Sequence, residues 1–183
     1  MANRALALST YQFSSRDELL FDANIWLFLH GPVPNQAGVK RIGDYSTAFK
    51  KILVAGCRIF IDVLIVSEFI NTYARLQWKA GHNHGITFKQ FRKSGAFKPI
   101  AKDIAAATHL ILKHCQQVES GFPGLDMTAL LNAYAMGDAD FNDHVIAGLC
   151  RNKGLTLVTD DADFAGQNIP VLTANKRLLT RQP

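Results

Sequence analysis

Short apolar runs alternate with longer amphipathic stretches along the chain. The runs cover residues 19–21, 59–61, 155–158 and 169–172, and the first and third are followed directly by acidic or other polar residues. Runs of this length without polar alternation are typical of strands that are buried on both faces. Their alternation with helical patterns predicts an α/β protein.

Between the strands, apolar side chains recur at helical spacing. This pattern predicts helices from residue 44 to a stop at Gly56, over 63–78, from Pro99 to about 118, over 127–136, over 141–153 and over 174–179. Asp140 is the expected N-cap and Gly154 the expected C-terminal stop of the fifth of these helices. Residues 31–43 are predicted as a loop, and residues 81–98 form the least regular internal segment.

Length and composition bound the architecture. A chain of 183 residues with 48% hydrophobic content can bury one sizeable core. We therefore expect an N-terminal extension over residues 1–18, with at most an edge strand, followed by a single domain over residues 19–183. No apolar run reaches about 18 residues and no signal peptide is recognisable, so we expect a cytoplasmic protein without membrane contact. Three scattered cysteines, Cys57, Cys115 and Cys150, are expected to be reduced thiols.

Charge is unevenly distributed around a formal net value of +5. Residues 75–113 contain eight Lys or Arg and a single acid, Asp103, whereas residues 120–164 contain seven acids and two bases. A basic rim beside an acidic metal pocket would suit a polyanionic substrate. On charge alone, solvation of ordinary helices is the favoured explanation of the basic region.

Four acidic residues fall at predicted strand ends or helix starts: Asp22, Glu68, Asp143 and Asp161. Asp140 and Asp163 are additional candidates. Glu68 interrupts an otherwise apolar helical stretch, where an unpartnered carboxylate would be costly to bury. Because carboxylates repel one another, such a group either remains in solvent or binds a cation.

These acids lie in four stretches, LLFDANIWLF, VLIVSEFIN, DFNDHVIAGLC and LTLVTDDADF. In order and spacing the stretches resemble the four acidic motifs of the PIN-domain ribonucleases, including toxins of the VapC type. The resemblance extends from Leu19 to Leu172. It implies a three-layer α/β/α fold with a central, mostly parallel sheet of about five strands.

The resemblance also implies a site. Asp22, Glu68, Asp143 and Asp161 match the four acids in order, and Asn24 and Thr159 match small polar positions that support the metal site. Two ambiguities stay open, because Asp140 competes with Asp143, and Asp160 or Asp163 competes with Asp161. The resemblance implies a metal-dependent endoribonuclease, the toxin of a type II toxin and antitoxin pair, with RNA as substrate, an antitoxin partner and a homodimeric state.

The ligand chemistry supports Mg²⁺ or Mn²⁺ independently of the resemblance, because the candidate ligands are all oxygens. In a two-metal site with ions about 3.5 to 4 Å apart, one ion activates water and the other stabilises the leaving 3′ oxygen. Basic residues interleaved with aromatic ones suggest a contact with RNA at Lys89, Arg92, Lys93 and Lys98.

Structural interpretations compete with these assignments. Asp140 and Asp143 have the spacing of a helix cap, and residues 160–163 could form turns. His82 and His84 fit an ordinary surface loop better than a metal site, and His144 is expected to face away from Asp143. The alternative function is a catalytically inactive protein of the same fold that binds RNA or acts as a scaffold.

Overall fold

A computed structural model describes residues 5–32, 36–82, 85–137 and 140–180 of the protein. Its centre is one parallel sheet in the order β1-β6-β5-β2-β3-β4. The strands are β1 (Ala5–Ala7), β2 (Glu18–Phe21), β3 (Arg58–Ile61), β4 (Gln116–Gln117), β5 (Thr156–Val158) and β6 (Val171–Thr173). Every pairing between them is parallel.

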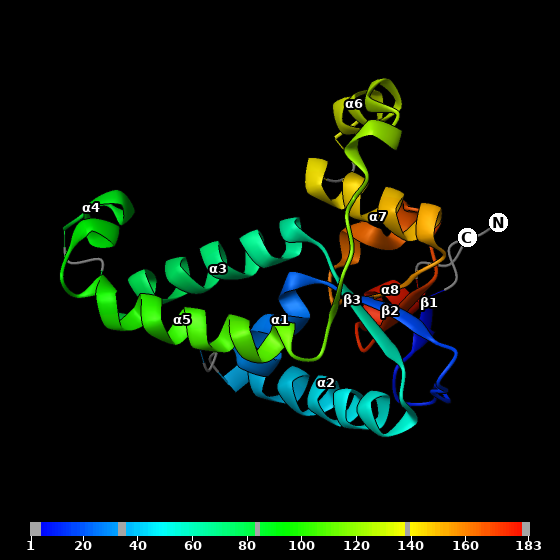
Figure 1. The fold of residues 1–183 in the computed structure, drawn as a ribbon, viewed down its shortest axis with the longest axis horizontal. Helices are drawn as coiled ribbons and strands as arrows, with labels where there is room; N and C mark the ends of the chain where they lie inside the picture. Colours follow the sequence, from blue (N-terminus) through cyan, green and yellow to red (C-terminus); the bar gives the residue numbers. More distant parts are fainter. Residues whose placement is uncertain (1–4, 33–35, 83–84, 138–139, 181–183) are drawn as a thin grey trace.

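The helices alternate with the strands. They are α1 (Ala23–His30), α2 (Gln36–Ala55), α3 (Val63–Gln77), α4 (Phe88–Lys93), α5 (Phe97–Leu112), α6 (Met127–Ala135), α7 (Phe141–Lys153) and α8 (Lys176–Thr180). A π-helical turn, η1 (Trp78–His82), extends α3, and two 3₁₀ turns follow as η2 (Phe122–Gly124) and η3 (Ala162–Gly166). The helices α1 and α2 lie on one side of the sheet and α7 on the other (Figure 1). This arrangement confirms the three-layer α/β/α fold, with a sixth strand in the sheet.

The core forms around β2 because this strand occupies the middle of the sheet. Leu19, Leu20 and Phe21 are each at most 1% exposed, as expected for a parallel strand with helices on both faces. Burial of each such side chain contributes about 1.5–3 kcal/mol. Trp26 of α1 packs beside Phe21, with ring centroids 5.0 Å apart. The start of α1 is thereby fixed against the end of the central strand.

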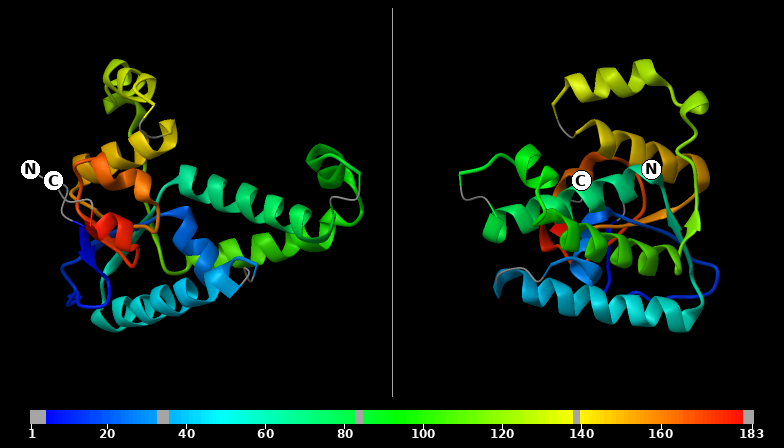
Figure 2. Two further views of the ribbon diagram at one scale, coloured as in Figure 1. Left: turned by 180° about the vertical axis from the view of Figure 1, so that it is seen from behind. Right: turned by 60° about the vertical axis from the view of Figure 1, so that its left-hand side comes forward.

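The helices α3, η1, α4 and α5 form a projection that we call the arm (residues 63–82 and 85–112) (Figure 2). Contacts between α3 and α5 hold the arm together along its length. The helix α4 lies at the tip, far from the sheet, and the base of the arm adjoins α1 (Figure 1). Among the described residues, none of the helices combines the length and apolar character needed to cross a membrane.

Three sequence predictions of local structure are wrong. The segment 31–43 is largely helical, because α2 begins at Gln36. Gly43 lies within this helix, and a Cβ added there would meet no neighbouring atom. The predicted end of the third helix, at about residue 118, is also wrong, since α5 ends at Leu112 and the chain then pairs with β3 as β4. The irregular segment contains α4, which begins with a capping box between Thr87 and Gln90.

Other expectations agree with the structure. The helix α7 covers Phe141–Lys153, with Asp140 as its N-cap and Gly154 in the left-handed conformation (φ 69°) that ends it. The possible edge strand in the first 18 residues is β1, which pairs with β6. Residues 138–139 and His84 lie outside the described residues.

Candidate metal centre

The four candidate acids lie on elements that meet beyond the carboxyl edge of the central strands. Asp22 follows β2 and is the N-cap of α1, and Asp161 follows β5 at the start of η3. Asp143 lies in the first turn of α7, and Glu68 lies in the second turn of α3. Parallel strands bring such positions together because their carboxyl ends share one edge of the sheet.

Asp22 is held most firmly of the four. Its Oδ2 accepts hydrogen bonds from the Thr159 hydroxyl (2.6 Å) and the Asn24 amide (2.5 Å), and its Oδ1 accepts one from the Ala23 backbone N–H (2.6 Å). Only 4% of the residue is exposed. The two positions expected to support the metal site, Asn24 and Thr159, therefore contact this carboxylate directly.

Burial and mutual repulsion raise the pKa values of three of these acids. Burial raises the pKa of Asp22 to about 6 against the opposing hydrogen bonds, with a smaller contribution from the charge of Asp161. Burial, followed by the charges of Asp140, Asp161 and Asp22, raises the pKa of Asp143 to about 7.

The pKa of Glu68 also rises to about 7, first by burial and then by the charges of Asp22, Asp140 and Asp161. Glu68 is nevertheless exposed, so water screens this shift more than the shift of Asp22. These carboxylates lie close enough to disfavour one another's charged forms.

The structure separates the roles of Asp140 and Asp143. The Asp140 carboxylate accepts the backbone N–H of Asp143 (3.0 Å), as an N-cap does. Asp140 is exposed, whereas Asp143 is partly buried one turn further into the site. Asp140 still contributes negative charge, because it raises the pKa of both Asp143 and Glu68.

The side chains of the three aspartates after β5, Asp160, Asp161 and Asp163, lie in different surroundings. The Asp160 carboxylate turns toward α2, where it accepts a hydrogen bond from Tyr45 (2.8 Å) and pairs with Arg41 (2.8 Å). Asp161 contributes to the raised pKa of Asp22, Glu68 and Asp143. Asp163 lines a separate hollow beside α6 and α7. The structure thus brings Asp161 to the acid cluster and turns Asp160 away from it.

Sequence reasoning missed the contribution of α2. The buried Tyr45 hydroxyl donates toward the Thr159 carbonyl (3.1 Å) or Asp160, and it accepts the Ala174 backbone N–H (3.1 Å). Asp160 in turn donates its N–H to the Asn24 side chain (3.2 Å), and Asn175 donates to the Asp160 carbonyl (2.6 Å). No local signal marked Tyr45, which occupies an ordinary inward position of an amphipathic helix.

The donor set fits a hard divalent cation. Carboxylate oxygens of the four acids, with the oxygens of Asn24 and Thr159 nearby, are the ligands that Mg²⁺ and Mn²⁺ prefer. Within the described ranges, no three His, Cys, Asp or Glu side chains are close enough to hold an ion as they stand. Asp161 raises the pKa of Asp22, Glu68 and Asp143, but the described acids are not arranged as a coordination shell.

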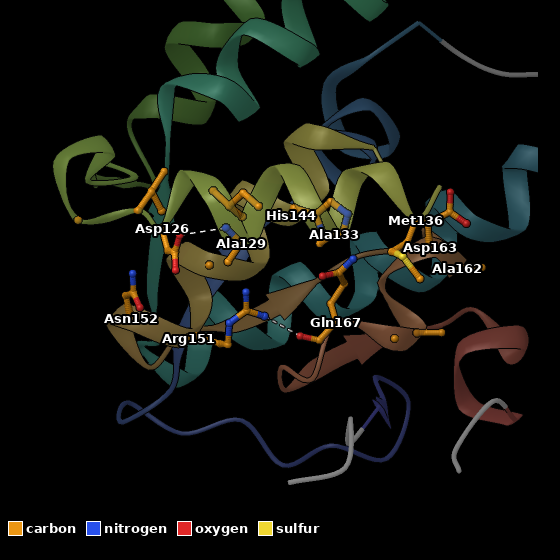
Figure 3. Close-up of a pocket in the computed structure, with 16 residues that line it drawn as sticks. Asp126, Ala129, Ala133, Met136, His144, Arg151, Asn152, Ala162, Asp163 and Gln167 are labelled. Atoms are coloured by element: carbon orange, nitrogen blue, oxygen red, sulfur yellow. Dashed lines mark hydrogen bonds between the residues drawn. The ribbon is translucent and has the colours of Figure 1, made fainter. Parts of the chain in front are cut away.

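The hollow that contains Asp163 is a different feature. It has a volume of about 790 Å³ and lies between α6, α7 and η3 (Figure 3). His144 lines it and is 6% exposed, whereas Asp143 does not line it, which agrees with the expectation that His144 faces away from Asp143. Its Nε2 has no hydrogen-bond partner among the described residues. Arg151 spans the other side of the hollow and donates to the Gln167 carbonyl (2.7 Å).

The cations expected to contact RNA lie on the arm. Lys89, Arg92 and Lys93 of α4 line a hollow of about 400 Å³ near the tip, together with Asn71, Arg75 and Phe88. Lys98 is exposed in the first turn of α5 and does not line this hollow.

Comparisons with known proteins support the fold. No family model and no curated protein matches the sequence. A solved structure of VapBC2 from Rickettsia felis, bound to a DNA fragment from their promoter, is similar over 86% of this chain and 99% of its own, with a TM-score of 0.55 and 13% identity. PAE2754 from Pyrobaculum aerophilum is similar over 93% of both chains, with a TM-score of 0.50 and 15% identity.

This likeness extends over nearly the whole of both solved chains. Both solved chains share the three-layer fold that the resemblance to PIN-domain ribonucleases implies. At these identities the likeness concerns the fold, so the chemistry of the site rests on the residues themselves.

Proposed function

We propose that the protein is a metal-dependent endoribonuclease that hydrolyses phosphodiester bonds of RNA at the acid cluster. The observation that carries the proposal is that Asp22, Asp161, Asp143 and Glu68 lie on elements that meet beyond one edge of the sheet. Asp161 raises the pKa of the other three acids, and Asp22 raises the pKa of Glu68 and Asp143. Like charges gathered at one sheet edge are costly without a cation. A divalent ion would relieve this repulsion and stabilise the ionised forms.

Each acid has a distinct task in this proposal. Asp22 is the anchor ligand, because its hydrogen bonds to Thr159, Asn24 and Ala23 fix its orientation before any ion binds. Asp143 is the second central ligand. Glu68 and Asp161, which are more exposed, complete the ligand set or orient the attacking water.

Mg²⁺ or Mn²⁺ held by these acids would supply Lewis acidity toward the scissile phosphate and would lower the pKa of bound water. The protein supplies position and charge. Asp140 and Asp143 lie at the N-terminal end of α7, and Asp22 lies at that of α1. The positive ends of the two helix dipoles therefore favour the ionised carboxylates that an ion requires.

The proposed biological setting is the toxin of a type II toxin and antitoxin pair. The support is that a solved structure of similar fold contains VapBC2, bound to a fragment of promoter DNA. An antitoxin partner and a homodimer are part of this proposal. An antitoxin would suppress cleavage by covering the acid cluster.

The test is cleavage of a structured RNA pool by purified protein in Mn²⁺, in Mg²⁺ and in EDTA. Wild type is compared with Asp143→Asn and with Asp103→Asn, a matched change at an exposed acid of α5. We expect cleavage that requires metal, is lost by at least about a hundredfold in Asp143→Asn, and persists in Asp103→Asn.

Binding of Mn²⁺ to the same proteins, followed by electron paramagnetic resonance, separates the alternatives. A folded wild type that binds neither Mn²⁺ nor Mg²⁺ and cleaves no RNA would refute the nuclease. That result would instead support the inactive RNA-binding or scaffold protein on the same fold.

A further inference from the structure

The hollow near the tip of the arm is surrounded by positive charge. Four of its lining residues are cationic, Arg75 from α3 and Lys89, Arg92 and Lys93 from α4, and none is acidic. All four are exposed, and within the described part of the chain none of them forms an ion pair. Crowded like charges without an acidic partner favour an anion in the space between them.

Phe88 orders the cations around this hollow. The guanidinium of Arg75 lies 4.7 Å from the centre of the Phe88 ring, and that of Arg92 lies 5.9 Å from it. Such cation–π contacts hold each arginine without neutralising it. The ring itself packs near Trp78 (5.9 Å) and Phe91 (6.4 Å), and Phe91 is fully buried. The arginines are therefore presented by a packed aromatic cluster.

The hollow is connected to the acid cluster along one face of α3. Glu68, Asn71 and Arg75 are spaced by three and four residues, so their side chains share that face. Seven residues of helix separate Glu68 from Arg75 by about 10 Å along the axis. Asn71 lines the hollow and lies between the two residues. A few nucleotides of extended RNA can bridge such a separation.

The acid cluster gives a reason for a second contact. A phosphodiester approaching four carboxylates is repelled until cations neutralise them, so that site contributes little affinity alone. Phosphate contacts with lysine and arginine supply most of the affinity of proteins for RNA without sequence recognition. The arm offers these contacts at a distance from the carboxylates.

We propose that the hollow formed by Arg75, Lys89, Arg92 and Lys93 binds the backbone phosphates of single-stranded RNA beside the segment to be cleaved. This inference rests on the proposed nuclease function for its substrate. It assigns Arg75 and Asn71 to the RNA contact and leaves Lys98 outside it. The arm then acts as a docking site. Long substrates gain affinity from it, whereas very short substrates do not.

The binding test uses fluorescence anisotropy of a labelled single-stranded RNA in EDTA at several salt concentrations. The double variant Lys89→Gln/Lys93→Gln removes two charges without touching Phe88. The matched control Lys50→Gln/Lys51→Gln removes two exposed lysines of α2. We expect the first pair to weaken binding roughly tenfold at 0.1 M salt, and to reduce the slope of log K against log salt by about 1.4.

Two binding results would overturn the inference. Equal losses in both double variants would show a general effect of net charge, and no loss in either would show that the hollow does not bind RNA. A third arm uses a polyglutamate peptide as competitor. If the peptide displaces RNA and its binding depends on Lys89 and Lys93 more than RNA binding does, the hollow serves an acidic protein segment and the RNA inference is wrong.

Cleavage separates this inference from the function on which it rests. The ratio of kcat/KM for a long single strand to that for a dinucleotide should fall about tenfold in Lys89→Gln/Lys93→Gln, with dinucleotide cleavage unchanged. A wild type that cleaves neither substrate refutes the nuclease, and the anisotropy result then decides the docking site alone. A wild type that cleaves both, with an unchanged ratio in the variant, refutes the docking site.

Discussion

Asp22 accepts three hydrogen bonds and still has a pKa of about 6, because burial outweighs the donors that favour its charge. Asp143 and Glu68 reach about 7 by burial and repulsion. At the scale of single residues, the ionised forms of these carboxylates are therefore unfavourable in the folded protein. Their cost can be measured as a loss of stability as well as through the chemistry of the site.

The metal-free protein should lose stability as the pH rises. In the unfolded chain Asp143 has its ordinary pKa near 3.8, against about 7 in the folded protein. Between these pH values the folded state binds more protons than the unfolded state. The stability that protonated Asp143 contributes is therefore fully present below about pH 4 and is lost progressively up to about pH 7. In EDTA, Asp143→Asn should melt a few degrees above wild type at pH 7.5 and near it at pH 4.5.

Thermal denaturation monitored by circular dichroism measures this difference. Asp103→Asn is the control and should follow wild type at both pH values. If Asp143→Asn and wild type differed equally at pH 4.5 and 7.5, the carboxylate would not be under electrostatic stress.

The neighbouring aspartates offer a second residue-scale prediction. Asp161→Asn should weaken Mn²⁺ binding strongly, because Asp161 raises the pKa of each of the other three acids and so faces them. Asp163→Asn, at the hollow beside α6, should leave Mn²⁺ affinity within about twofold of wild type. Titration with Mn²⁺ compares the two, and a reversed order would move the fourth ligand to Asp163.

At the scale of elements, α2 acts as a brace behind the site. Arg41 and Tyr45 lie one turn apart on α2, and both bind the Asp160 carboxylate. The Tyr45 hydroxyl also joins the ends of β5 and β6 through the Thr159 carbonyl and the Ala174 N–H. Thr159 is the same residue whose hydroxyl holds Asp22. Tyr45 of α2 is therefore linked to Asp22 through a single intermediate residue, Thr159.

Tyr45→Phe should weaken the metal site from a distance. The change leaves buried partners without their hydroxyl, which typically costs about 1–3 kcal/mol in the free energy of unfolding. We also expect a several-fold loss of Mn²⁺ affinity, since Thr159 and Asp160 lose their support. Tyr11→Phe, which removes a part-buried hydrogen bond to Asp17 (3.0 Å) away from the acid cluster, is the matched control.

Urea denaturation and Mn²⁺ titration give the two quantities separately. A destabilised Tyr45→Phe that bound Mn²⁺ as wild type does would make the hydroxyl a purely structural group. The hydrogen bonds of Tyr45 would then have no effect on metal binding at Asp22.

The elements also show what sequence patterns can predict. The bounds of α7 were predictable because Asp140 caps it and Gly154 ends it, and both signals lie within the helix's own sequence. The fold class was predictable because short apolar runs alternate with amphipathic stretches along the chain. The strand β4 was missed because its two glutamines are exposed and carry no pattern.

The choice among Asp160, Asp161 and Asp163 could not be made from local sequence. The partners that turn Asp160 away, Arg41 and Tyr45, lie more than a hundred positions earlier in the chain. The start of α2 was missed because Gly31, Pro32, Pro34 and Gly38 indicate a loop, whereas packing of α1 against α2 favours a helix from Gln36. Contacts between distant segments decided both cases.

At the scale of the whole molecule, stability should fall with distance from the sheet. The helix α6 packs mainly on α7, and Leu131, Tyr134 and Met136 on or just after it are exposed. The helix α4 packs mainly on α5 and η1 of the arm. Hydrogen exchange should therefore be faster by orders of magnitude in α4 and α6 than in β2 and α7. Mass spectrometry of the exchanged protein tests this, and uniform protection would contradict it.

The order of the strands also has a consequence for synthesis. The central strand β2 is made early, but one of its two neighbours, β5, is made last but one. The Thr159 hydroxyl that holds Asp22 is encoded 137 residues after it. A growing chain on the ribosome thus cannot assemble the acid cluster until most of its length has emerged. If the protein is the proposed nuclease, nascent and prematurely terminated chains would be harmless to the RNA that surrounds them.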